Sequence, residues 1–275
     1  MLAESLGLPL VAVPRSTRYG IIVFMDIATI FGLLIGFGGI IFGNLIEGGH
    51  MSSLMQVTAF LIVFAGTAGA VMVSSSEEAL KTGVRLAKKA FTHEKSDAHK
   101  KLEDIVEYAR LAKKDSLIAL EPRINRIADP LMQDVLRNVV DGVDEALLRD
   151  IFETQIYTEE EELLSGAKIW SDAGGFSPTI GIIGAVLGLI HVMGNLTDTS
   201  KLGAGIAVAF VATIYGVSFA NLVFIPLGNK IKRKVEDMTR EKLMVLEGGI
   251  LIAKGANHFI IEQKLRSYLP NVTKA

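Results

Sequence analysis

Four stretches of the sequence contain no Asp, Glu, Lys or Arg, and this pattern restricts the possible folds more than any other. They are Ile27 to Ile46, Leu54 to Val73, Gly175 to Gly194 and Leu202 to Gly228. Each is about 20 residues or longer, enough for a helix to cross roughly 30 Å of hydrocarbon. Two buried hairpins of a soluble α-protein are less favoured, because four such runs rarely occur in one soluble chain. We predict an all-α integral membrane protein with four transmembrane helices and a large helical cytoplasmic segment between helices 2 and 3.

The basic residues predict how these helices are oriented. The connection from Glu47 to Ser53 has no Lys or Arg, and the connection from Asn195 to Lys201 has only Lys201. Basic clusters precede the first stretch and follow the second and the fourth: Arg15, Arg18, Lys81, Arg85, Lys88, Lys89, Lys230, Lys232, Arg233 and Lys234. By the positive-inside rule, both termini and the long middle segment are predicted to be cytoplasmic.

Five segments follow from this arrangement. They are an N-terminal tail (1–24), a transmembrane hairpin (25–73), a cytoplasmic helical domain (74–173), a second transmembrane hairpin (174–228) and a cytoplasmic C-terminal helix (229–275). The tail lacks a basic region followed by an apolar core and a small-residue cleavage site, so a cleaved signal peptide is not predicted. The chain has no cysteine, so it forms no disulfide.

The middle segment has the pattern of several helices. Apolar residues recur close to a 3.6 period between Asp97 and Pro122, and Ser96 or Asp97 is a candidate N-cap. Pro122 and Pro130 are expected to mark helix boundaries. The stretch from Glu77 to Phe91 is predicted to extend the second membrane helix as an amphipathic helix.

The sequence favours transport or energy coupling over catalysis. It has no metal-spaced cluster of His, Cys, Asp or Glu, no phosphate-binding glycine loop and no nucleophile elbow. We therefore expect no enzyme activity, no cofactor and no nucleic-acid partner. Proteins that move ions normally keep a charged group at membrane depth, yet none of the four stretches has one. Either hydroxyls and backbone alone line the path, or another chain supplies the carboxylate.

Glycines and prolines in the four stretches point to close helix contacts and to a disturbed helix. The first stretch has two GxxxG pairs and the third has one, at Gly184 and Gly188; these join either helices of one chain or different chains. Pro178 is expected in the first turn of the third helix, where its missing N–H costs little. Pro226 is expected to free the carbonyl of Leu222 near the inner end of the fourth helix.

Five motifs between Met25 and Pro270 occur in a recognisable order. They are "MDIATIFGLLIGFGGIIFGNLIEGGH", "ARLAKKDSLIALE", "SPTIGIIGAVLGLI", "ATIYGVSFANLVFIPLGNKIKRK" and "LEGGILIAKGANHFIIEQKLRSYLP". They resemble, respectively, the first span, the rotor-facing cytoplasmic motif, the third span, the fourth span with its basic exit, and the C-terminal helix of the MotA/PomA family of flagellar motor stator subunits. The family is related to ExbB and TolQ.

The resemblance implies partners and a location. In that family a MotB-like subunit has one transmembrane helix with an essential aspartate and a periplasmic peptidoglycan-binding domain. A pentamer of MotA-like chains surrounds a dimer of this partner in the lipid of the bacterial inner membrane, with spans three and four facing inward. The missing carboxylate is then the partner's aspartate.

The resemblance also implies site residues. Pro178, Thr213 and Pro226 would face the ion path, although Thr213 alone is more often a residue that bonds its own helix. Lys113 and Glu121 would engage the rotor protein FliG through complementary charge. They are eight positions apart, about two turns on a continuous helix. The family usually has Arg and Gly where this chain has Lys113 and Ser116.

The resemblance favours protons as the ion. Sodium-type members have a threonine where the third-span alignment places Ala185, and a hydroxyl oxygen helps to replace the water that sodium sheds. Two alternatives are kept. An ExbB or TolQ-type energiser would have three spans, and a small-solute transporter would act without a partner chain.

Overall fold

The computed structural model describes residues 27–92, 97–197 and 199–269, and every element in these ranges is helical. The predicted tail of residues 1–24 and the candidate cap Ser96 lie outside the described residues. The elements are α1 (Ile27–Ile46), α2 (Met51–Leu54), α3 (Val57–Ser74), α4 (Glu77–Ala90), α5 (Ala98–Asp115), η1 (Leu117–Leu120), α6 (Glu121–Ile124), α7 (Pro130–Val140), α8 (Glu145–Met193), α9 (Thr199–Phe219), η2 (Ala220–Phe224), α10 (Ile225–Ala253) and α11 (His258–Arg266). The predicted all-α fold is confirmed.

Among the described residues, four helices are long and apolar enough to cross a membrane, and they cover nearly all of the four charge-free stretches. They are Ala28–Ile46, Met51–Ser74, Glu145–Met193 and Leu202–Ala253. The last two are much longer than a membrane is thick, at 49 and 52 residues. The large helical segment predicted between the second and third membrane helices is also present, from α4 to the first part of α8.

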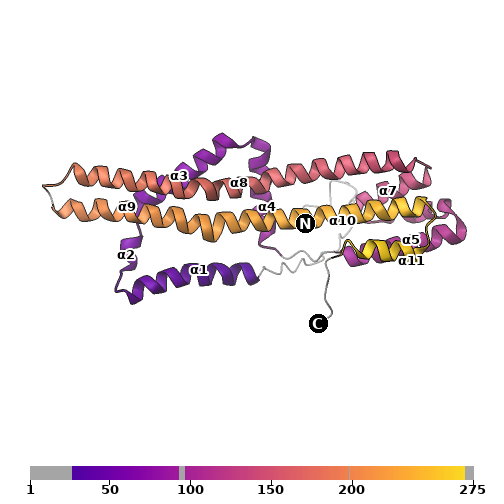
Figure 1. The fold of residues 1–275 in the computed structure, drawn as a ribbon, viewed down its shortest axis with the longest axis horizontal. Coiled ribbons are helices and arrows are strands. Elements are labelled where there is room, and N and C mark those ends of the chain that lie inside the picture. The colour runs from indigo at the N-terminus through magenta and orange to yellow at the C-terminus, as the bar shows by residue number, and fades with distance from the viewer. Residues whose placement is uncertain (1–26, 93–96, 198, 270–275) are drawn as a thin grey trace, which may run out of the picture.

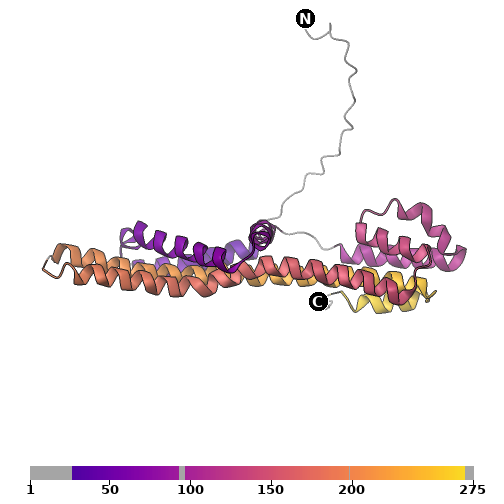
Figure 2. The same ribbon diagram turned by 90° about the horizontal axis from the view of Figure 1, so that it is seen from above.

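Two long rods run side by side along the molecule (Figure 1). One is α8, and the other is the unbroken succession of α9, η2 and α10. The short helices gather at opposite ends, α1 to α3 at one end and α5, α7 and α11 at the other (Figures 1 and 2). Residues 173 and 228, at which the sequence suggested segment boundaries, fall inside α8 and α10.

Pro178 lies inside α8, so the expectation that it occupies the first turn of a helix is wrong. The helix begins at Glu145, where the carboxylate of Asp144 accepts a hydrogen bond from the N–H of Ala146 at 3.0 Å. A proline in a helix interior cannot donate to the carbonyl four residues earlier, here that of Gly174. The change in hydropathy near Gly175 therefore marks entry into the membrane and not the start of a helix.

Pro226 disturbs the other rod where the sequence predicted. The five residues Ala220–Phe224 form a π-helical turn, and α10 starts immediately before the proline. The N–H of Ile225 donates to the carbonyl of Ala220, five residues earlier instead of four. A single π turn of this kind shifts the register of the hydrogen bonds without ending the helix.

The helix from Glu77 is amphipathic as predicted, but it does not continue α3. The second membrane helix ends at Ser74, and Ser76 caps α4 by accepting a hydrogen bond from the N–H of Ala79 at 3.2 Å. Figures 1 and 2 show α4 lying across the two long rods. Asp97, the other candidate cap, is the N-cap residue of α5 but accepts no side-chain cap bond. Pro122 and Pro130 both lie at helix starts, as predicted.

The end of the molecule that holds α5, α7 and α11 has the largest apolar core. Its buried residues come from those helices, from η1 and α6, and from the nearby ends of α8 and α10; they include Ile105, Leu120, Leu136, Leu148, Met244, Ile250 and Ile261. The C-terminal part of α10 therefore folds together with residues 98–156 of the middle segment, because both bury side chains in one core.

Candidate functional site

The seam between α8 and α9 is closed by glycines. A Cβ atom on Gly216 would lie 2.6 Å from the carbonyl oxygen of Ser177 and 3.3 Å from the Cα of Pro178. A Cβ on Gly181 would lie 2.9 Å from the carbonyl oxygen of Ala212. Backbone meets backbone at this seam, so a larger residue at either glycine would have to move a helix.

The GxxxG pair in α8 and the two pairs in α1 differ in what surrounds their glycines. In α8, a Cβ on Gly188 would meet the carbonyl oxygen of Gly205 at 2.8 Å, so this glycine joins helices of one chain. In α1, only Gly36 has a neighbour, the side chain of Leu222, whereas Gly32, Gly39 and Gly43 have nothing within 4 Å in the described chain.

Ser177 belongs to this seam, although the sequence analysis did not identify it. Its side chain is fully buried, and its Oγ donates to the carbonyl of Gly216 at 3.0 Å. This bond ties α8 to α9 beside Pro178. The only signal in the sequence was a hydroxyl residue next to a proline in an apolar stretch, and such a residue more often bonds its own helix.

The structure brings Pro178 and Thr213 to the same seam. A Cβ on Gly181, three residues after Pro178, would lie 3.4 Å from the Cα of Thr213. The hydroxyl of Thr213 donates to the carbonyl of Ala209, one turn earlier in its own helix, at 3.2 Å. Ala185 is half-buried on the same helix as Pro178. The seam therefore carries hydroxyls and carbonyls.

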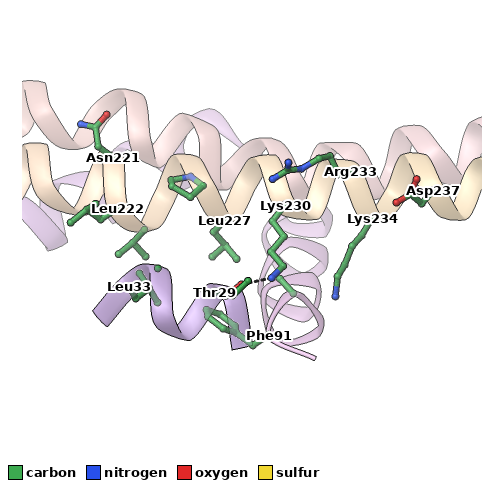
Figure 3. Close-up of a pocket in the computed structure, with 15 residues that line it drawn as sticks. Thr29, Leu33, Phe91, Asn221, Leu222, Leu227, Lys230, Arg233, Lys234 and Asp237 are labelled. Carbon is green, nitrogen blue, oxygen red and sulfur yellow. Dashed lines mark hydrogen bonds between the residues drawn. The ribbon is translucent and has the colours of Figure 1, made fainter. Parts of the chain in front are cut away.

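Pro226 lies apart from that seam. It is exposed, and it lines a cavity between α10 and α1, which Figure 3 shows with the neighbouring residues. Of the four residues predicted for the ion path, Pro178 and Thr213 therefore meet at the contact between α8 and α9. Pro226 instead faces the cavity beside α1. The described residues contain no group of three His, Cys, Asp or Glu side chains that could hold a metal ion.

Lys113 and Glu121 do not lie on one continuous helix, which corrects the expectation. The first of them is in the last turn of α5 and the second starts α6, with the turn η1 between them. The chain breaks at Ser116, whose φ of 105° makes it the only non-glycine residue with positive φ in the described ranges. The Nζ of Lys113 donates to the carbonyl of Gly255 at 3.0 Å. Glu121 is exposed and forms no ion pair in the described chain.

An ion-pair network holds α5, α7 and α10 together at this end of the molecule. The ammonium of Lys101 on α5 pairs with Asp129, the N-cap of α7, and with Glu241 on α10 at 2.6 Å. Burial alone would raise the pKa of Asp129, but hydrogen bonds from Lys101 and from the N–H of Met132 outweigh it and lower that pKa. Burial would also lower the pKa of Lys101, yet its hydrogen bonds to both carboxylates raise it.

The fold and the seam define a class of protein: a multi-pass helical membrane protein whose spans supply no titratable carboxylate or amine. The model of the MotA/TolQ/ExbB proton channel family matches residues 123–244, and that of the motility protein A N-terminal region matches residues 30–116. Motility protein A of Helicobacter pylori (strain ATCC 700392 / 26695) is 32% identical over 245 residues, which cover 89% of this chain and 95% of that protein.

Two solved structures are similar over nearly the whole chain. The structure of C. jejuni MotAB has a TM-score of 0.85 at 31% identity, covering 91% of this chain and 98% of that chain. The flagellar MotAB stator complex from Bacillus subtilis has a TM-score of 0.80 at 32% identity, covering 89% and 96%. The chain belongs to the motility protein A family and is a flagellar motor stator subunit. An ExbB or TolQ-type energiser is not favoured.

Proposed function

We propose that this chain conducts protons together with a MotB-like partner and converts their flow into torque on the rotor. The proposal depends on one observation: the four apolar stretches that cross the membrane contain no carboxylate. A proton path needs a group that binds and releases protons within the membrane. The partner's single transmembrane helix, with its aspartate, would supply that group, and its peptidoglycan-binding domain would anchor the complex.

The assembly we propose is a pentamer of this chain around a partner dimer in the bacterial inner membrane. The similarity to MotAB complexes supports the partner. The α8 and α9 spans would face the partner, with both termini on the cytoplasmic side. In intact cells, a cysteine at exposed Ser53 should react with an impermeant thiol reagent, and one at exposed Asn125 should not. The reverse pattern would contradict this orientation.

Protons are favoured because the position of Ala185 has no hydroxyl oxygen that could replace the water shed by a sodium ion. The test is to record rotation by the complex in sodium-free buffer at fixed proton-motive force. Rotation should persist without sodium and disappear when the partner is left out. Rotation that requires sodium would overturn the proton assignment, and solute uptake by this chain alone would favour the transporter.

Lys113 and Glu121 would steer contact with FliG. Both side chains are exposed at the end of the molecule away from α1 to α3, and charge pairs of this kind set register and rate more than stability. Lys113→Glu and Glu121→Lys should each impair motility while the protein still reaches the membrane. Lys114→Glu changes the charge of an adjacent exposed lysine and is the control. Loss of both variants from the membrane would instead indicate a structural role.

A further inference from the structure

A cavity of about 590 Å³ lies where α1, the end of α4 and the junction of η2 with α10 come together (Figure 3). Thr29 and Leu33 face it from α1, Phe91 from the end of α4, and Leu222 and Lys230 from the long rod. The helix α1 contacts the rod farther along, where the Phe37 and Phe219 rings are 5.4 Å apart.

The chemistry of the cavity changes along its length. One part is walled by Gly32, Leu33, Leu222, Val223 and Leu227, all of which lie within the charge-free stretches. The other part is lined by Lys230, Arg233 and Lys234, with Asp237 as the one acidic residue lining it in the described chain. Leu222 and Arg233 are separated by about 16 Å of helix, close to half the thickness of a bilayer's hydrocarbon core.

The basic residues begin where the apolar stretch ends. The fourth charge-free stretch closes at Gly228, so Lys230 and Arg233 lie just beyond the hydrocarbon, at the depth of lipid headgroups. A molecule complementary to this lining is apolar at membrane depth and negatively charged at the membrane surface. Phospholipids with an anionic headgroup have both properties in that order.

We propose that the cavity binds one anionic phospholipid from the leaflet at which α10 leaves the membrane. Its phosphate would be held by Lys230 and Arg233, and an acyl chain would lie against Leu33 and Leu222. A guanidinium can donate two parallel hydrogen bonds to a phosphate. The lipid would fill the gap that separates α1 from the rod. The inference needs only that these helices lie in a membrane, and it does not depend on the ion or the rotor.

The three basic residues that line the cavity differ in their hydrogen-bond partners. The Nζ of Lys234 donates to the carbonyls of Lys89 at 2.8 Å and Thr92 at 2.6 Å, and so closes the C-terminal end of α4. Lys230 donates to the hydroxyl of Thr29 and spans the gap between α10 and α1 (Figure 3). Arg233 is exposed and makes no hydrogen bond or ion pair with the described residues, which leaves it available to a headgroup.

The test is the relative affinity of spin-labelled phosphatidylglycerol and phosphatidylcholine for the purified complex of this chain with its partner. The wild-type complex should prefer phosphatidylglycerol. Arg233→Gln should reduce this preference about fivefold, the effect of one basic residue at a membrane surface. Lys232→Gln is the matched control, because Lys232 is exposed on α10 and carries the same charge but does not line the cavity.

Two further measurements separate a lipid from other occupants. Leu33→Trp fills the apolar part without changing any charge, so it should also remove the preference; it decides the question if Arg233→Gln fails to assemble. Soluble glycerol phosphate should not displace the lipid, because it contacts only the basic part. Three results would each overturn the proposal. The first is an equal loss of preference in Arg233→Gln and Lys232→Gln, and the second is displacement of the lipid by glycerol phosphate. The third is a wild-type complex with no preference, because a neighbouring copy of the chain fills the cavity.

Discussion

The membrane end of this molecule and the opposite end, which holds α5, α7 and α11, use the same two rods but pack them in different ways. At the membrane end, α8 meets α9 through Gly181, Gly188 and Gly216, where backbone lies against backbone. At the opposite end, the first part of α8 meets the last part of α10 through large apolar side chains such as Phe152 and Ile250.

The solvent explains this difference. Lipid tails are as apolar as leucine, so apolar side chains gain little by leaving lipid, and helices associate through close contact and hydrogen bonds such as Ser177 to Gly216. In water, burial of apolar surface is the main favourable term, and a core of large side chains forms. The ion pairs differ between the two ends in the same way, because the Lys101 network lies at the end opposite the membrane, outside the charge-free stretches.

The largest effect is expected from a side chain placed in the glycine seam. Gly216→Val puts atoms within 2.6 Å of the Ser177 carbonyl oxygen, which is backbone and cannot move aside. Overpacking costs roughly 1–3 kcal/mol even where side chains can yield. We expect loss of the assembled complex and of motility. Gly203→Val, on the same helix with nothing within 4 Å, should have little effect. Comparable assembly of the two variants, measured by gel filtration, would show that close approach is dispensable.

A smaller and more local effect is expected in the Lys101 network at the opposite end. Lys101→Met leaves two carboxylates, each about 20% exposed, without their shared cation. A hydrogen bond to a charged group stabilises a fold by roughly 1.5–3 kcal/mol, and this variant loses such bonds to both carboxylates. The thermal unfolding temperature of the purified complex should fall by several degrees, while the glycine seam stays intact. Lys100→Met, an adjacent exposed lysine, is the control. Equal melting of the two variants would mean that the network adds nothing to stability.

The same network predicts a dependence on pH. The pKa of Asp129 is lowered below its ordinary value of 3.8, so its stabilisation is complete above that value and is lost as the pH falls through the lowered pKa. The pKa of Lys101 is raised above 10.5, so its stabilisation is present below that value and lost as the pH rises through the raised pKa. Asp129→Asn keeps a good N-cap and removes the charge. It should destabilise the complex at neutral pH and less so at about pH 3; a constant difference would argue against the ion pair.

The smallest effect is a gain of stability at the break between α5 and η1. Ser116 has φ 105° and ψ 165°, a region that is essentially restricted to glycine and costs other residues about 1–3 kcal/mol. Ser116→Gly should therefore raise the free energy of unfolding by about 1 kcal/mol, after the greater chain entropy of glycine is subtracted. Urea unfolding of wild type and variant measures this. A variant no more stable than wild type would mean that the turn is unstrained.

The sequence by itself determined the number of membrane helices, the approximate limits of their apolar parts and the position of the helix disturbance at Pro226. These features depend on local composition, because a membrane span needs a continuous apolar stretch and a proline affects only the adjacent turn. The sequence also placed Pro122 and Pro130 at helix starts and identified the amphipathic helix from Glu77.

Only the tertiary structure decided how these pieces join. The helix α8 continues through the change in hydropathy near Gly175 because its backbone hydrogen bonds are local and are indifferent to the surrounding solvent. The contact between Ser177 and Gly216, 39 residues apart, and the gathering of Lys101, Asp129 and Glu241 depend on which faces of distant helices meet. Local periodicity describes each face but not its partner, and for that reason the seam, the network and the cavity at Lys230 emerged only from the assembled fold.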